Sequence, residues 1–270
     1  MSDTSTAPPA QPAPPPFDPD PAERGARDAR SSDRLFLQLL AYTNCHDEPA
    51  VVQAVTSAVT HSRGDAASAA SNAPLDAVVY RNVNDPLGIA VLTLTPDPSA
   101  LAGPIRDLLR QPPFTELTPR PDLTMIGRTY SIGYEHDLPE TLQHRPRRHA
   151  LDPACPWAVW YPLRRSGAFA RLPRPEQMDI LKEHGTLGMA YGRARLAQDI
   201  RLASHGLDAH DNDFTIGLLG PDLAPLSKLV ETMRGTIQTS QYLTNLGPFF
   251  VGHVLYQSSN THVPPPPARH

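Results

Sequence analysis

Apolar residues recur along this chain with two spacings, one typical of strands and one typical of helices. In the first half, they predict strands at 34–42, 75–83, 89–95 and 123–134, and helices at 48–61 and 98–110. The first half therefore has the order strand, helix, strand, strand, helix, strand.

The second half repeats this order. Strands are predicted at 157–163, 200–204, 213–220 and 247–256, and helices at 175–198 and 221–234. The duplication is visible in the letters, since 89–110 and 214–234 share a strand, a Pro-Asp helix start and a terminal Arg. Tandem repeats of this order predict an α+β fold with two ferredoxin-like (βαββαβ) domains, of the dimeric α+β barrel type. Such repeats pack sheet against sheet and leave a cavity between sheet and helices.

Proline is unevenly distributed and marks the borders of these domains. The 270 residues include 32 prolines, and eight of them lie between Pro8 and Pro21. Because proline has no amide hydrogen and this segment offers few apolar side chains, it should stay extended and solvated. We expect disordered tails at 1–31 and 259–270, domains at 32–138 and 157–258, and a linker at 139–156.

Composition argues against several classes of function. Lys and Arg number 24 against 28 Asp and Glu, a net charge of −4, so neither nucleic acid nor an anionic membrane is a favoured partner. Cys45 and Cys155 lie in no CxxC, CxxCH or zinc-ligand spacing, so a disulfide framework, a zinc finger and covalent haem attachment lack their signatures. No apolar run approaches the roughly 18 residues of a spanning helix, and no signal-peptide pattern is present. We expect a cytoplasmic protein.

The predicted helix 175–198 carries the strongest candidate for chemistry. Its apolar positions recur at helical spacing on the face that carries His184, so this imidazole points inward among apolar neighbours. Gly185 and Gly188 lie on the adjoining side, and each costs about 1 kcal/mol of helix stability relative to alanine. A packed core histidine and a flat cofactor close to the glycines are both compatible with this pattern.

Several motifs of the second half resemble a known family. In order, they are WAVWYPLRRSG (157–167), EHGTLGMAYG (183–192), GLDAHDNDF (206–214), a helix ending in MR (233–234) and LGPFFVG (246–252). This series resembles the chlorite dismutase family, which includes the coproheme decarboxylases, over most of residues 155–255. The resemblance implies a non-covalent haem b or iron coproporphyrin (coproheme), a small oxidant such as peroxide, and a homo-oligomer, which in that family is a pentamer.

The resemblance also assigns roles by position. His184 resembles the proximal haem-iron ligand, and Tyr161 resembles the radical tyrosine of the coproheme decarboxylases. The other positions carried over are cofactor contacts, at Arg147, Arg148, Arg164, Arg165, Gly188, Gln198 and Ser240. Arginine suits a haem propionate because its guanidinium binds a carboxylate through two hydrogen bonds. From the residues alone, Tyr161 is equally an ordinary strand tyrosine, and 145–149 a solvated basic linker.

One stretch departs from the family pattern. Two extra residues before Gly206 leave Ala197 or Gln198 where chlorite dismutases carry a distal arginine, unless the insertion brings in Arg195 or Arg201. Without that cation, chlorite conversion is disfavoured.

We therefore expect a haem-dependent oxidoreductase, either peroxidase-like or a peroxide-driven decarboxylase that acts on the propionates of coproheme. The alternatives are a non-enzymatic haem or tetrapyrrole carrier or sensor, and a paralogue whose cavity is empty. His205 or His210 could take an acid–base role on the open iron face, although histidines in so polar a turn are more often solvated.

Overall fold

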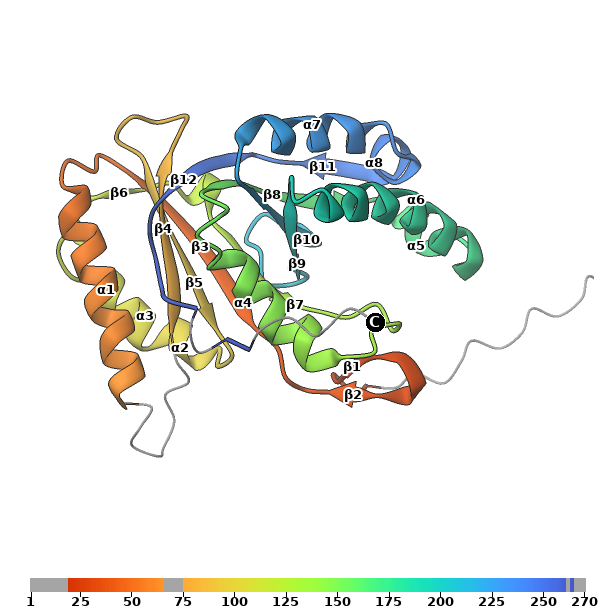
Figure 1. The fold of residues 1–270 in the computed structure, drawn as a ribbon, viewed down its shortest axis with the longest axis horizontal. Helices are drawn as coiled ribbons and strands as arrows, with labels where there is room; N and C mark the ends of the chain where they lie inside the picture. Colours follow the sequence, from red (N-terminus) through yellow and green to blue (C-terminus); the bar gives the residue numbers. More distant parts are fainter. Residues whose placement is uncertain (1–18, 66–74, 261–262, 265–270) are drawn as a thin grey trace, which may run out of the picture.

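Two sets of four strands close into one antiparallel barrel that helices cover on two sides (Figure 1). The computed structural model describes residues 19–65, 75–260 and 263–264. The first half comprises β3 (Phe36–Thr43), α1 (Glu48–Asp65), β4 (Asp76–Asn82), β5 (Ile89–Thr95), α2 (Ser99–Ala102), α3 (Pro104–Leu109) and β7 (Met125–Thr129). The second comprises β8 (Trp157–Arg165), α5 (Gly167–Arg171), α6 (Arg174–Arg193), β9 (Gln198–Ala203), β10 (Phe214–Gly220), α7 (Leu223–Arg234), α8 (Ile237–Tyr242), β11 (Leu243–Leu246) and β12 (Phe250–Gln257). The short elements are β1 (Glu23–Arg24), β2 (Arg30–Ser31), β6 (Thr118–Pro119), the 3₁₀ turns η1 (Ala26–Asp28), η2 (Phe114–Glu116) and η3 (Pro121–Leu123), the π-helix η4 (Glu140–His144), and α4 (Arg145–Ala150).

Both halves arrange their strands in the same spatial order. The first half runs β7-β3-β5-β4, and the second runs β12-β8-β10-β9, which in both is the fourth, first, third and second strand of the unit. β4 pairs with β12 and β7 pairs with β9, so the two four-stranded sheets join at both edges. These findings confirm the predicted α+β fold of two ferredoxin-like units. Because the two units share one barrel, they have a common core rather than two separate ones.

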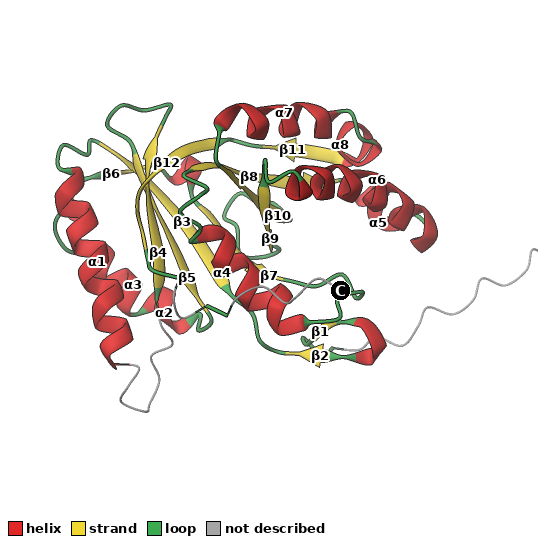
Figure 2. Cartoon of the chain, in the orientation of Figure 1, coloured by secondary structure: helices red, strands yellow, loops and turns green. Residues whose placement is uncertain are grey.

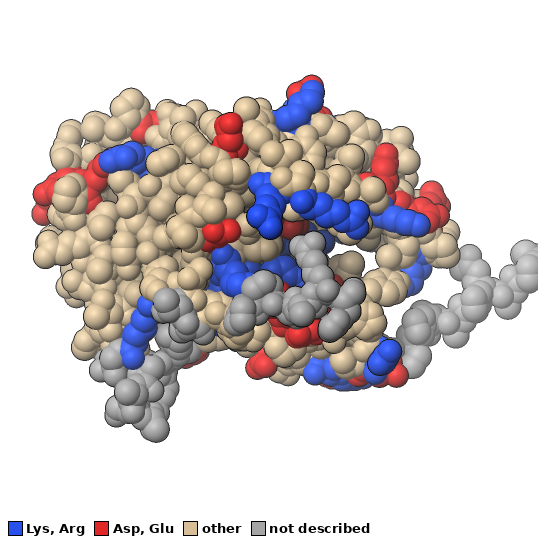
Figure 3. All heavy atoms as spheres, in the orientation of Figure 1, with Lys and Arg blue, Asp and Glu red and all other residues tan. Residues whose placement is uncertain are grey.

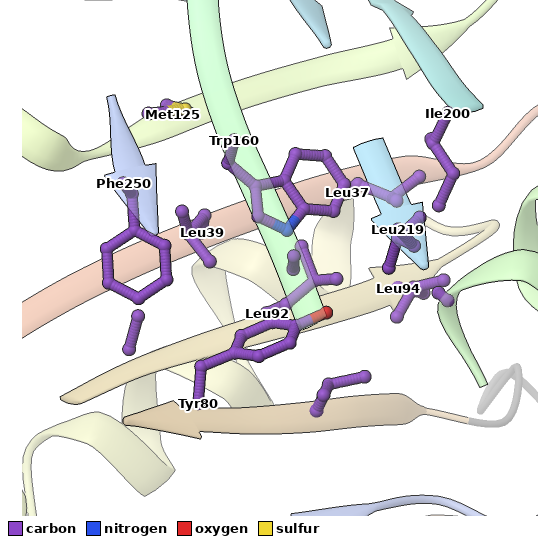
Figure 4. Close-up of a cluster of buried hydrophobic side chains, with 14 of the residues drawn as sticks. Leu37, Leu39, Tyr80, Leu92, Leu94, Met125, Trp160, Ile200, Leu219 and Phe250 are labelled. Carbon is purple, nitrogen blue, oxygen red and sulfur yellow. The ribbon is translucent and has the colours of Figure 1, made fainter. Parts of the chain in front are cut away.

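The barrel interior is filled by side chains from both halves. Trp160, Tyr80 and Phe250 are fully buried there, among leucines of β3, β5, β9 and β10 (Figure 4). Gly217 of β10 makes room for the indole ring, because a Cβ at this position would lie 2.5 Å from Trp160. Successive residues of a strand point to opposite faces, so the residues that alternate with the interior ones face the helices.

The helices form two separate outer layers (Figure 2). α1 and α3 cover the first half, where Val51, Val55 and Ile105 are fully buried. α6 and α7 cover the second half, where Leu226 and Leu229 pack against β8 and β10. In residues 19–65, 75–260 and 263–264, none of the helices combines the length and the apolar composition of a membrane span.

Two predicted helices differ from those in the structure. The helix expected at 98–110 is divided into α2 and α3, because Gly103 leaves the helical conformation and Pro104 begins a new helix. The helix expected at 175–198 ends at Arg193, and Arg195 then adopts a positive φ of 57° before β9 begins.

The structure corrects two of the expected boundaries. Residues 23–31 were assigned to the disordered tail, but they form the β1–β2 hairpin, which is fastened to the barrel by an ion pair between Glu23 and Arg128 at 2.5 Å. Residues 139–156 were assigned to a linker, but they include η4 and α4, whose Leu142 and Ala150 are buried. The remaining tail residues, 1–18, 261–262 and 265–270, lie outside the described part of the chain.

Candidate functional site

One row of side chains on the helix-covered face of the second half combines polar and apolar groups. In the strand register, Tyr161 of β8 pairs with Ile216 of β10, which pairs with Arg201 of β9. Ile200 and Leu202 lie in the barrel interior, so Arg201 between them points to the opposite face, as Tyr161 does. Neighbouring strands are about 4.8 Å apart, which places the backbones of Tyr161 and Arg201 roughly 10 Å apart.

α6 covers this face without packing closely against it. Of its 20 residues, only Ile180 is buried, and His184 is half-buried on the same side of the helix. A Cβ at Gly185 would meet nothing within 4 Å, and one at Gly188 would meet only Met233 Cε, at 3.8 Å. Figure 3 shows a hollow beneath α6 with Lys and Arg atoms on its floor. Gly185 is exposed, so the open space at its Cβ position is solvent, whereas the half-buried Gly188 leaves room beside Met233.

His184 is held on one side by Thr236. The Thr236 hydroxyl lies 3.3 Å from His184 Nδ1. Burial lowers the pKa of His184, and the positive charges of Arg165 and Arg201 lower it further. The imidazole is therefore neutral at pH 7, which is the form that binds a metal ion through a ring nitrogen.

Arg165 is a half-buried cation for which the described part of the chain shows no ion pair, although the charge of Asp213 acts on it. Its guanidinium lies 4.8 Å from the ring centroid of Phe169 and 4.5 Å from that of Phe214. Its Nε is buried and has no hydrogen-bond partner there. Burial lowers the pKa of Arg165. An unpaired, desolvated guanidinium is suited to an anionic ligand, and a carboxylate can accept two of its hydrogen bonds.

Arg201 provides a second positive charge, and it remains accessible. Its side chain is 48% exposed and pairs with Asp199 at 3.1 Å. Asp199 raises the pKa of Arg201, and Tyr130 and Glu135 contribute to the same shift. We refer to Tyr161, His184, Arg165 and Arg201 together as the α6 site. A flat, anionic cofactor with one metal ion fits these groups, since the site offers one neutral imidazole, two guanidinium groups and unfilled space.

Most other predicted contacts already have partners within the chain. Arg147 Nε binds the buried Asp76 at 3.2 Å, so the structure does not bring it to the α6 site. Arg148 binds Glu140 and the carbonyl oxygen of Pro264. Arg164 pairs with Asp211 at 2.6 Å. Gln198 donates a hydrogen bond to Asp152 at 2.8 Å, and Ser240 donates one to the Thr236 carbonyl at 2.8 Å.

The two alternative histidines lie in the turn after β9. His205 Nδ1 lies 3.2 Å from Asp213 Oδ1, and His210 Nε2 lies 3.1 Å from the carbonyl oxygen of Pro121. His205 is exposed, whereas His184 is half-buried. No group of three or more His, Cys, Asp or Glu residues within the described ranges could hold a metal ion by itself. A metal at the α6 site would therefore depend on a macrocycle for its other ligands.

The family of the chain follows from comparison with known proteins. A family model described as chlorite dismutase matches residues 56–255, which is most of the chain. The chain belongs to the chlorite dismutase family. No curated protein matches it.

Solved structures related to the chlorite dismutase family have the same fold. One is a haem-binding protein from Thermus thermophilus, with a TM-score of 0.62 and 20% identity over 83% of this chain and 94% of that one. Another is chlorite dismutase from Candidatus Nitrospira defluvii in complex with imidazole, with a TM-score of 0.60 and 13% identity over 83% of this chain and 92% of that one. At this level of identity the likeness concerns the fold alone.

The sequence identified the site residues on α6 and β8 better than the arginine on β9. His184 lies on the same side of α6 as the buried Ile180, as its helical spacing predicted, and Tyr161, which the family resemblance singled out, lies on the helix-covered face of β8. Arg201 was one of two alternatives for a distal cation, with Arg195, and only the start of β9 at Gln198 fixes the face to which it points. Thr236 was missed, because no local pattern links it to a histidine 52 residues away.

Proposed function

We propose that this chain is a haem-dependent oxidoreductase and that His184 is its proximal iron ligand. The observation that carries this proposal is the neutral, half-buried imidazole of His184 beside unfilled space on a helix that buries only Ile180. The haem-binding relative from Thermus thermophilus supports the choice of cofactor. A haem held by one protein ligand supplies an open iron position at which a small oxidant such as peroxide can be reduced.

The residues of the α6 site have separate tasks in this proposal. His184 Nε2 binds the metal, and Arg165 binds a propionate, because its Nε lacks a partner in the described part of the chain. Arg201 attracts a small anionic or polar oxidant from solvent, since half of its side chain is accessible. Chlorite conversion was disfavoured because the sequence offered no assured distal cation. Arg201 supplies a cation on this face, so chlorite belongs among the oxidants to be tested.

Tyr161 supports a finer proposal, in which iron coproporphyrin is both cofactor and substrate. Its ring is buried, stacks on Phe249 with centroids 4.8 Å apart, and faces the helix layer. Burial raises the pKa of Tyr161, so Oη keeps its proton until the phenol is oxidised. With peroxide as the two-electron oxidant, Tyr161 would give up one electron and its phenolic proton, and the phenoxyl so formed would take a hydrogen atom from the β-carbon of a propionate. Loss of a second electron from that propionate would release carbon dioxide and leave a vinyl group, while the peroxide is reduced to two waters.

Haemin titration tests the main proposal. The wild-type chain should bind haemin with one defined Soret spectrum, and His184→Ala should lose that spectrum while its far-UV circular dichroism is unchanged. His205→Ala is the matched control, because this exposed histidine carries an aspartate partner and should bind haemin like the wild type. A wild-type spectrum in His184→Ala would show that the ligand lies elsewhere and refute the proposal.

Peroxide addition to the coproheme complex tests the finer proposal. Mass analysis of the porphyrin should show loss of carbon dioxide in the wild type and no loss in Tyr161→Phe. Tyr80→Phe is the matched control, since Tyr80 is equally buried but lies inside the barrel. If the wild type turns over peroxide or chlorite without altering the porphyrin, the peroxidase or chlorite activity replaces the decarboxylase, and with no turnover the protein is a carrier or sensor.

A further inference from the structure

Thr236 lies at the junction of α7 and α8, directly beside the imidazole of His184. Only 2% of Thr236 is exposed. Its hydroxyl caps the first turn of α8 by accepting a hydrogen bond from Thr239 N at 3.4 Å. The same oxygen lies 3.3 Å from His184 Nδ1. One side chain therefore fixes a helix end and contacts the candidate iron ligand.

The hydrogen bonds of this hydroxyl determine which nitrogen of His184 carries the proton. A threonine hydroxyl has one hydrogen to donate and two lone pairs that accept. Thr236 Oγ1 donates its hydrogen to the carbonyl oxygen of Met233 at 2.8 Å, an atom that can only accept. Thr239 Oγ1 lies 3.2 Å from the same oxygen and is the other acceptor of that hydrogen. In either arrangement Oγ1 does not donate to the imidazole, so at the His184 contact Oγ1 accepts and Nδ1 is the donor. The ring that carries its hydrogen on Nδ1 leaves the lone pair of Nε2 free.

No carboxylate takes the place of the hydroxyl at this contact. Glu183 precedes His184 in the sequence, but its Oε2 accepts a hydrogen bond from the backbone N–H of Ile237 at 3.0 Å. The partner of His184 Nδ1 is thus a neutral oxygen that also accepts a hydrogen bond from Thr239 N. A neutral acceptor pulls the Nδ1 proton less strongly than a carboxylate does. Nε2 therefore donates less electron density to a metal ion.

We propose that Thr236 is a positioning residue, which holds His184 with its hydrogen on Nδ1 and presents the Nε2 lone pair to iron as a neutral imidazole. The inference rests on the proposed function for its iron, but the hydrogen-bond arrangement belongs to the chain itself. It predicts that the protein without haem already has the tautomer that binds metal. It also predicts that a carboxylate at position 236 makes the bound iron harder to reduce.

Nuclear magnetic resonance of the haem-free chain labelled with ¹⁵N-histidine tests the tautomer. The His184 signals, assigned by their loss in His184→Ala, should show a protonated Nδ1 and an unprotonated Nε2. Thr236→Ser should keep this pattern, and Thr236→Val should give a mixture of both tautomers. Asp222→Ala is the control for a lost helix cap, because Asp222 caps α7 through Ala224 N and does not contact His184.

Haemin provides the second measurement. Thr236→Val should weaken haemin binding by roughly 10- to 100-fold, the usual effect of removing the partner of a ligating histidine. Thr236→Ser should stay within a few-fold of the wild type. Thr236→Asp keeps a side chain that can cap α8 and places a carboxylate near Nδ1, so its reduction potential should be more negative than that of the wild type.

The two measurements separate this inference from the proposed function. A single Nδ1–H tautomer that persists in Thr236→Val, or an Nε2–H tautomer in the wild type, overturns the role of Thr236 even if haemin binds. Failure of the wild type to bind haemin refutes the proposed function, whereas the tautomer result still decides the role of Thr236. An unchanged reduction potential in haemin-loaded Thr236→Asp also counts against the inference.

Discussion

Asp76 joins two arginines at one end of the barrel, and Asp76→Asn should destabilise the fold without weakening haem binding. The Asp76 carboxylate is fully buried. Its Oδ1 lies 2.6 Å from Arg63 Nη2, and its Oδ2 lies 3.2 Å from Arg147 Nε. Burial lowers the pKa of Arg147, and the charge of Asp76 opposes that shift. The asparagine variant keeps the size of the side chain but removes the counter-charge of a buried guanidinium.

The magnitude follows from the exposure of the two arginine side chains. Arg147 is 9% exposed, so its pair belongs to the buried class, in which loss of one partner costs about 3–5 kcal/mol. Arg63 is 29% exposed and can regain water, so its contribution is below about 1 kcal/mol. For a chain of this size, a loss of about 3–5 kcal/mol lowers the melting temperature by roughly 6–20 °C.

Urea unfolding of the haem-free chain, followed by far-UV circular dichroism, measures this loss. Glu48→Gln is the matched control, because it breaks the Glu48–Arg81 pair at 2.7 Å, whose arginine is 54% exposed, and should cost less than about 1 kcal/mol. Haemin affinity, measured well below the melting transition, should be the same in Asp76→Asn and the wild type. The reasoning fails if Asp76→Asn unfolds like the control. If Arg147→Ala instead loses haemin affinity at unchanged stability, the propionate role expected for Arg147 is correct.

Four further predictions concern packing, pH, the tail and assembly. Gly217→Ala should lose about 1–3 kcal/mol in the same urea assay, because the new methyl group would lie 2.5 Å from the Trp160 ring. Burial lowers the pKa of His149 in the folded state, so the unfolded chain binds the extra proton, and stability should fall as pH drops below about 6.5, with a smaller slope in His149→Gln. Deletion of 1–18 should leave the melting temperature unchanged, whereas deletion of 1–31 should lower it, because it removes the β1–β2 hairpin. Light scattering should give a particle several times 29.4 kDa, and a monomer would contradict the homopentamer that the family resemblance implies.

The fold could be predicted because its signals are local and repeated. The strand around Tyr161 shows the apolar character of a buried strand, and the duplicated order of elements indicates the barrel class. The same pattern cannot show which face of β8 is the barrel interior, since Trp160 and Tyr161 are both buried, on opposite sides. Closure of the barrel decides this, because it requires pairings between the two halves, such as β4 with β12.

The polar parts of the structure were harder to predict, because their partners are distant in sequence. The segment RPRRHA contains three arginines in six residues, which is typical of an exposed linker, yet it forms α4. Arg147 is buried there because the fold brings it to its counter-charge, Asp76, at the start of β4. The two residues are 71 positions apart in the sequence, so no local pattern predicts the pair. For Arg201, the sequence left the orientation of the side chain open. Its residue type was noted, but only the position at which β9 begins fixes the side of the sheet that it faces.

The two halves share one topology but differ in what completes the contact between helix and sheet. In the first half, α1 presents Val51 and Val55, and both are fully buried against the sheet. In the second half, α6 presents a half-buried histidine and two glycines, and only Ile180 is buried. Side chains therefore complete the first interface, while the second remains open over polar residues of β8 and β9. The difference arises from the composition of one helix, and it places the candidate site of the described residues in the second half.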